Sequence, residues 1–167
     1  DVTRFLFGEA ESVYAHIQRI NPAIKGEDVA NVVMRMKNGM HCYTEMSYAS
    51  IREKEVFPQT LVFVEGSRGS ISLEAGFQIK IHTKKHNILF QEKPIEYPWA
   101  DPLYSVVHSS IVDCNRNILR ALQGSAPAET TGNDNLETVK LVWASYESAR
   151  KNKVIRMDEF AMAPLNQ

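Results

Sequence analysis

The feature that most constrains the fold is a pair of alternating segments joined by a two-residue turn. Residues 28–37 and 40–49 place apolar and polar side chains in alternation, which is the period of a β-strand. Between them stands Asn38-Gly39, whose backbone readily takes the positive φ angles of a tight hairpin. Further strands are predicted at residues 11–20, 60–65, 70–73, 77–82, 86–91 and 154–157. The sequence therefore predicts a largely antiparallel sheet built from hairpins.

Two other segments have the period of a helix. From residue 103 to residue 122 the apolar side chains recur every three or four positions, and Gly124 ends the run. Later in the chain, Asp134 and Glu137 resemble a capping box that opens a second helix. The apolar positions of this second helix are Leu136, Val139, Val142, Trp143 and Tyr146. Residues 158–167 are predicted to form a tail.

The first residues of the chain have the pattern of the end of a helix. Val2, Phe5 and Leu6 follow helical spacing, and Gly8 supplies the left-handed conformation at which helices stop. No capping residue precedes the first turn, and two turns by themselves are too short to be stable in water. We therefore expect the chain to be a piece of a larger protein.

Composition excludes several classes of partner. The 167 residues carry a net charge of −1, with basic and acidic residues intermixed, so no basic field exists to hold nucleic acid or an anionic membrane surface. No apolar stretch approaches the ~20 residues that cross a bilayer. Cys42 and Cys114 stand apart and belong to no metal-binding motif. These features predict a cytoplasmic protein that binds neither nucleic acid nor membrane.

The pattern as a whole predicts an α+β fold. Residues 1–167 are expected to form a single domain, an open, largely antiparallel sheet with helices packed on one face. Residues 28–37 and 40–49 carry apolar groups on both sides of their strands, for instance Val33 and Tyr43 on the side opposite the methionines. We therefore expect the other face of the sheet to be available for oligomerisation. The alternative is partial cover by the chain's own loops.

Several short motifs stand in a characteristic order. They are Asp1-x-x-Arg4-Phe5-Leu6-x-Gly8-Glu9, Gly26-Glu27-Asp28-x-Ala30, Asn38-Gly39, Glu65-Gly66-Ser67-x-Gly69-Ser70-Ile71, Thr131-Gly132-Asn133-Asp134-x-Leu136-Glu137-Thr138 and Tyr146-Glu147-Ser148-Ala149. In this order they resemble the C-terminal domain of the Gfo/Idh/MocA family, named after glucose-fructose oxidoreductase and inositol dehydrogenase. The resemblance covers most of the chain.

The resemblance implies an NAD(P)-dependent oxidoreductase of which this chain is one half. In that family an N-terminal Rossmann domain binds the cofactor, and the C-terminal domain closes over the substrate and carries subunit contacts. The sequence has no Gly-x-Gly-x-x-Gly run with which to hold a dinucleotide, so NAD or NADP is expected in the absent domain of the parent protein. The family's catalytic Lys and His are likewise expected upstream of Asp1. Glu92-Lys93-Pro94 matches the family's catalytic tripeptide only by coincidence, because it follows a hairpin outside the Rossmann half.

The resemblance also suggests substrate-binding residues. Asp1 matches the last residue of the family's His-x-x-Asp pattern, whose carboxylate can bond substrate hydroxyls, although it could also be an ordinary helix carboxylate. Trp99, Tyr104 and His108 lie in the loop and helix start that approach the substrate cleft in the family, with simple packing or exposure as the alternative. The chain contributes no catalytic residue and no metal ligand of its own, and by itself it is expected to be inactive.

The preferred interpretation is the substrate-binding and oligomerising half of an oxidoreductase that acts on a sugar, polyol or related hydroxylated compound. Its expected partners are that small molecule, its own missing Rossmann domain and further copies of itself. The alternative is a free-standing, non-catalytic interaction module. Ser105, His108 and Asp113 invite a hydrolase hypothesis, but the sequence lacks the Gly-x-Ser-x-Gly elbow that such a serine needs.

Overall fold

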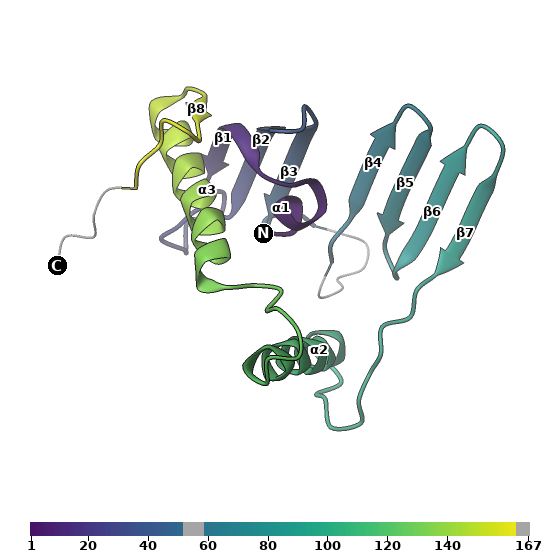
Figure 1. The fold of residues 1–167 in the computed structure, drawn as a ribbon. Helices are drawn as coiled ribbons and strands as arrows, with labels where there is room; N and C mark the ends of the chain where they lie inside the picture. Colours follow the sequence, from purple (N-terminus) through teal and green to yellow (C-terminus); the bar gives the residue numbers. More distant parts are fainter. Residues whose placement is uncertain (52–58, 163–167) are drawn as a thin grey trace. The chain divides into compact units, whose positions relative to one another are not determined.

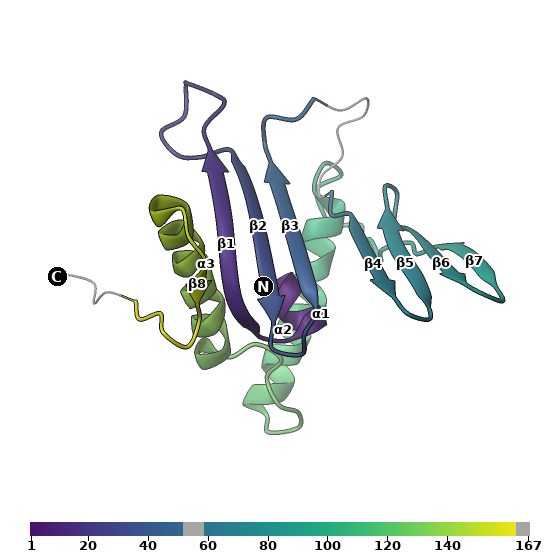
Figure 2. The ribbon, with the colours of Figure 1, turned by 90° about the horizontal axis from the view of Figure 1, so that it is seen from above.

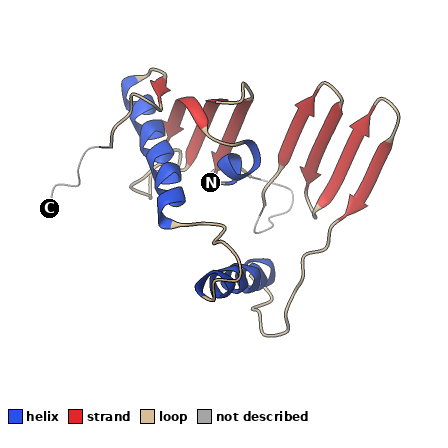
Figure 3. Ribbon diagram, viewed as in Figure 1, coloured by secondary structure: helices blue, strands red, loops and turns tan. Residues whose placement is uncertain are grey.

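The computed structural model describes residues 1–51 and 59–162 and contains helices and two antiparallel sheets (Figures 1 and 3). The elements in chain order are α1 (Val2–Phe7), β1 (Ala10–Gln18), β2 (Val29–Met36), β3 (His41–Ser47), β4 (Val62–Gly66), β5 (Gly69–Glu74), β6 (Gln78–Thr83), β7 (Asn87–Gln91), α2 (Ser105–Leu122), α3 (Gly132–Lys151) and β8 (Ile155–Arg156). The α+β class and the antiparallel pairing are confirmed. The structure adds that the strands are divided between two sheets, which belong to two compact units: Asp1–Arg52 with Thr130–Gln167, and Glu53–Glu129.

The first unit holds a four-stranded sheet in the order β3-β2-β1-β8. Its central hairpin turns where the sequence predicts: Gly39 has a φ of 89°, and the side-chain oxygen of Asn38 accepts a hydrogen bond from the Met40 amide. Figure 2 shows the three long strands of this sheet side by side, with α3 alongside β1. In their register Val33 lies opposite Tyr14 on one side and Tyr43 on the other.

The core of the first unit lies between this sheet and α3. Its buried members are Ala10, Val13, Met34, Met36, Cys42, Leu141, Ala144, Ile155 and Met157. Each large apolar side chain that is fully buried contributes roughly 1.5–3 kcal/mol. Ser148 is a fully buried polar residue: its hydroxyl accepts a hydrogen bond from the Ala15 amide and donates to the Lys153 carbonyl, so that α3 is joined directly to β1 and to the turn before β8.

This packing decides which of the two apolar sides predicted for residues 28–37 is buried. Met34 is 3% exposed and faces α3, whereas Val33 is 39% exposed on the opposite face. Tyr14 and Tyr43 flank Val33 on that outer face, where polar neighbours such as Asn31 follow in the next row. The outer face therefore carries one short row of apolar and aromatic side chains rather than a continuous apolar surface.

The capping box predicted for the second helix was wrong. Helix α3 begins at Gly132, and its N-cap is Thr131, whose hydroxyl accepts from the Asp134 amide at 3.1 Å. The Asp134 side chain does not cap the helix and instead accepts a hydrogen bond from Arg4 of α1. At the other end Asn152 closes the helix in the left-handed conformation, with a φ of 50°. In the predicted tail, Phe160 packs against the core, and residues 163–167 lie outside the described residues.

The second unit holds an antiparallel meander in the order β4-β5-β6-β7. One of its faces is made of apolar side chains in two cross-strand rows: Val62, Leu73, Ile79 and Phe90, and Val64, Ile71, Ile81 and Ile88. Ile71, Ile88 and Phe90 remain 40%, 49% and 41% exposed. After this sheet an irregular segment leads into α2, which begins at Ser105, two residues later than predicted.

Among the helices that the structure describes, none has the length and apolar character required to span a membrane.

Candidate substrate-binding residues

Asp1, the carboxylate suggested for substrate hydroxyls, occupies the N-cap position of α1, where its side chain makes no capping hydrogen bond. Its carbonyl accepts from the Phe5 amide, and its side-chain oxygen Oδ1 accepts from the Thr138 hydroxyl of α3 at 3.1 Å. Asp1 is exposed, and Thr138 accounts for one of its side-chain contacts. Because a carboxylate has two acceptor oxygens and that of Asp1 is exposed, Asp1 can hold α1 to α3 and still accept a hydrogen bond from a hydroxylated ligand.

A buried arginine supports this end of α1, and sequence reasoning missed its role. Arg4 is 8% exposed and donates to both carboxylate oxygens of Glu9 at 3.1 Å from Nε and at 2.5 Å from Nη2. It also donates to the carbonyl and side chain of Asp134, both at 3.0 Å, and to the Thr138 hydroxyl at 2.7 Å. We call Arg4, Glu9, Asp134 and Thr138 the Arg4 cluster. The hydrogen bonds from Arg4 lower the pKa of the Glu9 carboxyl.

The Arg4 cluster fixes the element that carries Asp1. A helix of six residues is too short to be stable without tertiary contacts, and here the planar guanidinium joins it to the start of β1 and to the first turns of α3. Thr138 stands in both sets of contacts, since it accepts from Arg4 and donates to Asp1. The sequence does hold a signal for this cluster. Arg4-Phe5-Leu6 and the motif that contains Asp134 both belong to the set of motifs that carries the family resemblance.

The other three suggested residues lie in one segment of the second unit, residues 97–108. Its backbone is held by specific hydrogen bonds: the Tyr97 amide donates to the buried Ser109 hydroxyl at 3.1 Å, and the Ala100 amide donates to the Tyr97 carbonyl at 3.0 Å. Asp101 then forms a turn in which its side chain accepts from the Leu103 amide at 2.8 Å. The loop before α2 therefore has a defined conformation.

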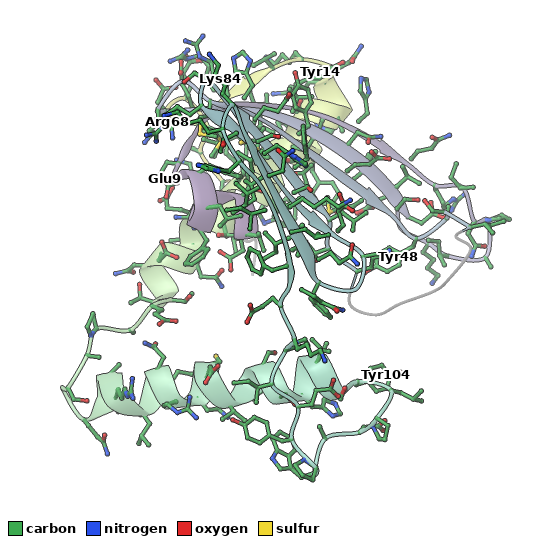
Figure 4. All side chains as sticks on the ribbon, turned by 90° about the vertical axis from the view of Figure 1, so that its right-hand side faces the viewer. Glu9, Tyr14, Tyr48, Arg68, Lys84 and Tyr104 are labelled. Atoms are coloured by element: carbon green, nitrogen blue, oxygen red, sulfur yellow. The ribbon has the colours of Figure 1, made fainter. Side chains whose placement is uncertain are left out.

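This segment presents aromatic side chains and one histidine. Trp99 is 62% exposed and stacks on Tyr97, with ring centroids 5.7 Å apart and planes at 20°. Tyr104, which lies at the start of α2 (Figure 4), has its ring centroid 5.9 Å from that of His108. The Asp101 amide donates to Nδ1 of His108 at 3.2 Å. With Nδ1 acting as the acceptor, the ring proton lies on Nε2, which can donate to an oxygen of a ligand.

The structure thus places Tyr104 beside His108 and stacks Trp99 on Tyr97 in the same segment, while Asp1 belongs to the other unit. A cavity of about 190 Å³ in the first unit contains none of these residues and is smaller than the roughly 300–1,000 Å³ typical of ligand pockets. It is lined by Glu9, Ala10, Glu11, Lys37, Glu137, Lys140, Leu141, Met157 and Asp158.

A pyrophosphate needs a glycine turn between a strand and a helix, and no Gly-x-Gly-x-x-Gly occurs anywhere in the sequence. Within residues 1–51 and 59–162, no group of three or more His, Cys, Asp or Glu side chains could hold a metal ion. Glu92-Lys93-Pro94 follows directly after β7, where the Glu92 amide donates to the Phe77 carbonyl at 2.9 Å.

Residues 1–72 match the model of the GFO/IDH/MocA C-terminal domain. They include α1, the Arg4 and Glu9 members of the Arg4 cluster, and the hairpin of β2 and β3. This part of the chain carries the sequence of a Gfo/Idh/MocA C-terminal domain. The resemblance read from the sequence motifs is confirmed.

Individual relatives match nearly the whole chain. D-apiose dehydrogenase of Paraburkholderia graminis is 35% identical over 157 residues, which are 94% of this chain and 42% of that protein. D-apiose dehydrogenase of Rhizobium rhizogenes is 31% identical and covers 93% of this chain and 45% of that protein. The crystal structure of an oxidoreductase from Agrobacterium radiobacter in complex with NAD+, L-tartaric acid and magnesium superimposes with a TM-score of 0.91 at 30% identity, over 95% of this chain and 46% of that chain. The chain therefore spans less than half the length of these relatives.

Proposed function

We propose that this chain is the substrate-binding and oligomerising half of an NAD(P)-dependent oxidoreductase that acts on a sugar, polyol or related hydroxylated compound. The observation that carries the proposal is the 35% identity with a D-apiose dehydrogenase over 94% of the chain. A solved relative that contains both NAD+ and L-tartaric acid, a hydroxylated acid, supports the same class of cofactor and ligand.

The candidate residues suit a hydroxylated ligand. The exposed ring of Trp99, held by its stack on Tyr97, offers an apolar surface against which the C–H groups of a sugar can pack. The Nε2–H of His108 can donate to a hydroxyl or carbonyl oxygen, and the Asp1 carboxylate can accept from a hydroxyl. An aromatic surface with a placed donor, such as Trp99 and His108 provide within the second unit, is the usual composition of a small-molecule site. Asp1, in the first unit, is a separate candidate.

Redox chemistry belongs to the half of the parent protein that precedes this chain. When bound there, the nicotinamide cofactor would supply hydride transfer, and the family's catalytic Lys and His are expected upstream of Asp1. The present chain binds and orients the substrate by the contacts above. We propose that the parent protein works in the cytoplasm.

The decisive experiment assays the longer protein that contains this chain for NAD(P)-dependent oxidation of a panel of sugars and polyols. Asp1→Ala should lower kcat/KM roughly ten- to hundredfold, because one hydrogen bond to a charged group contributes about 1.5–3 kcal/mol. Cofactor affinity should not change. Thr138→Val is the comparison variant, since it removes the bonds of Thr138 to Asp1 and to Arg4 and leaves the carboxylate in place. Equal losses in the two variants would show that Asp1 acts only by holding α1.

His108 can be tested in the same assay. His108→Gln replaces the ring donor and should raise KM for the substrate several-fold. His82→Gln is the control, because His82 is a histidine outside this segment whose Nδ1 likewise contacts a neighbour, Asn87, at 3.2 Å. If both variants keep the wild-type KM, His108 does not bind the substrate.

We also propose that the chain by itself does not bind nicotinamide cofactors, because it lacks the glycine turn that holds a pyrophosphate. Titration with NADH and NADPH, followed by nicotinamide fluorescence, should show no saturation at micromolar concentrations. Saturable binding with a Kd near 1 μM, roughly −8 kcal/mol, would contradict the proposal that the other half of the parent protein binds the cofactor.

We also propose that copies of the chain associate through a sheet face. The most apolar face in the second unit, with Ile71 40% exposed at its middle, is a stronger candidate than the short row around Val33 in the first unit. A two-fold contact would need to bury at least ~1,000 Å². Ile71→Lys and Val33→Lys, compared by light scattering, should show which face holds the copies together. Met34→Lys is unsuitable because Met34 lies in the core. A wild-type chain that stays monomeric at high concentration would contradict self-association.

A further inference from the structure

Helix α2 holds the loop that precedes it at two points. Ser109 is 5% exposed, and its hydroxyl oxygen accepts a hydrogen bond from the Tyr97 amide at 3.1 Å. The preceding residue, His108, accepts from the Asp101 amide through Nδ1 at 3.2 Å. Two consecutive residues of one helical turn thus bind backbone amides that stand on either side of Trp99 in the chain. We call this pair of hydrogen bonds the α2 clamp.

The burial of Ser109 needs an explanation. Every residue of α2 belongs to the described part of the chain, and Ser109 is the one that is buried. Larger apolar residues of the same helix, such as Ile111 and Leu122, are exposed. Burying a serine gains little apolar area, and burying its hydroxyl costs free energy unless the hydroxyl is hydrogen-bonded. The bond to the loop therefore accounts for this residue better than packing does.

Between the two points of the α2 clamp the chain makes a tight turn that carries Trp99. Pro98 and Trp99 are the central residues of this turn, which is closed by the bond from the Ala100 amide to the Tyr97 carbonyl at 3.0 Å. Proline favours the second position of such a turn because its ring fixes φ. The Trp99 ring in turn stacks on the Tyr97 ring. Because Ser109 holds the Tyr97 backbone, it also restricts where the stacked Trp99 ring can lie.

We propose that Ser109 is a positioning residue for the substrate: by holding Tyr97, it fixes the Trp99 ring against which a sugar packs. The inference rests on the proposed function and adds to it a buried residue that acts through its neighbours. A ring that is already oriented loses less conformational entropy when a ligand covers it. Releasing the loop weakens substrate binding and leaves the chemical step unchanged. Loss of the Ser109 hydroxyl should therefore raise KM without lowering kcat.

The test measures kcat and KM of the longer protein that contains this chain, with the sugar or polyol that it oxidises fastest. Ser109→Ala should raise KM roughly two- to tenfold, which is the loss expected for one hydrogen bond, and should leave kcat unchanged. Ser110→Ala is the matched control, because Ser110 is the next residue, is exposed, and donates to the Val107 carbonyl within α2. This control should keep the wild-type KM.

A second pair of variants separates the hydrogen bond from the size of the side chain. Ser109→Thr keeps a hydroxyl, whereas Ser109→Val has nearly the same shape without one. The threonine variant should therefore have a lower KM than the valine variant, and amide exchange at Tyr97 should be faster in the valine variant. Equal KM values in the two variants would overturn the role of the hydroxyl.

A double-mutant cycle tests whether Ser109 acts through Trp99. In the Trp99→Ala background, Ser109→Ala should raise KM no further, because the ring that it positions is gone. A further rise of the same size, or a lower kcat at unchanged KM, would overturn the inference and leave the proposed function in place. If the longer protein oxidises no sugar or polyol, the proposed function is wrong and the inference falls with it.

Discussion

Replacing Arg4 by Met should destabilise the first unit markedly, because the Arg4 cluster is its main polar connection between α1, β1 and α3. Met has a similar length and apolar stem, so the change removes the guanidinium with little loss of packing. The Arg4 side chain is 6% exposed, whereas those of Glu9 and Asp134 are 43% and 48% exposed. The two carboxylates can therefore regain water when their partner is lost.

The magnitude follows from the partners. The Asp134 carbonyl and the Thr138 hydroxyl are neutral acceptors, each worth about 0.5–1.5 kcal/mol, and the bidentate contact with half-exposed Glu9 adds about 1 kcal/mol after solvent screening. The sum is about 2–4 kcal/mol. For a chain of this size that corresponds to a fall in Tm of roughly 5–15 °C.

Urea unfolding followed by circular dichroism measures this loss, and amide exchange in α3 and β1 assigns it to the first unit. The control is Arg156→Met, the same substitution at an arginine that also contacts several carboxylates but is 47% exposed. Exposed ion pairs contribute little, so the control should stay close to the wild type. A loss from Arg4→Met no larger than that from Arg156→Met would refute the reasoning.

The same variant predicts a pH dependence. The hydrogen bonds from Arg4 hold the pKa of Glu9 below its usual value of 4.5, so the contact stabilises the folded state above that pH and is lost as the pH falls through the lowered pKa. The wild-type free energy of unfolding should therefore fall more steeply below about pH 4.5 than that of Arg4→Met. Parallel curves would contradict the assignment of the pKa shift to Arg4.

Two other positions offer sharp tests of the local structure. Gly69→Ala should destabilise the second sheet by roughly 2–4 kcal/mol in thermal unfolding, because a Cβ there would lie 2.1 Å from the His82 carbonyl oxygen and the backbone φ is 156°. Gly66→Ala is the control, because the nearest atom to its Cβ would be 3.8 Å away. Thr131→Ala should cost about 1 kcal/mol of α3 stability through the lost N-cap, with Thr131→Ser restoring it, as judged by amide exchange in the first turn of α3.

Local signals determined much of the secondary structure. The Asn38-Gly39 turn, the strand alternation and the stop at Gly8 depend on φ preferences and periods that a few neighbouring residues encode, and each is present in the structure. The family resemblance likewise came from motifs in order, and it holds. The start of α3 was harder to predict, because Thr131 and Asp134 are both good capping residues. Thr131 is the cap in the structure, since the Asp134 side chain binds Arg4 instead.

Tertiary structure alone decided what these elements do together. Alternation shows that Val33 and Met34 face opposite sides, but only the packing of α3 decides which of them is buried. The Arg4–Asp134 contact joins residues 130 positions apart, and the division of the strands into two sheets depends on pairings of the same kind. No local pattern encodes such contacts, because they exist only once the chain has brought distant segments together. The sequence by itself thus determined the elements and the family, and the fold decided how α1 is held, which faces remain exposed and where the candidate binding residues lie.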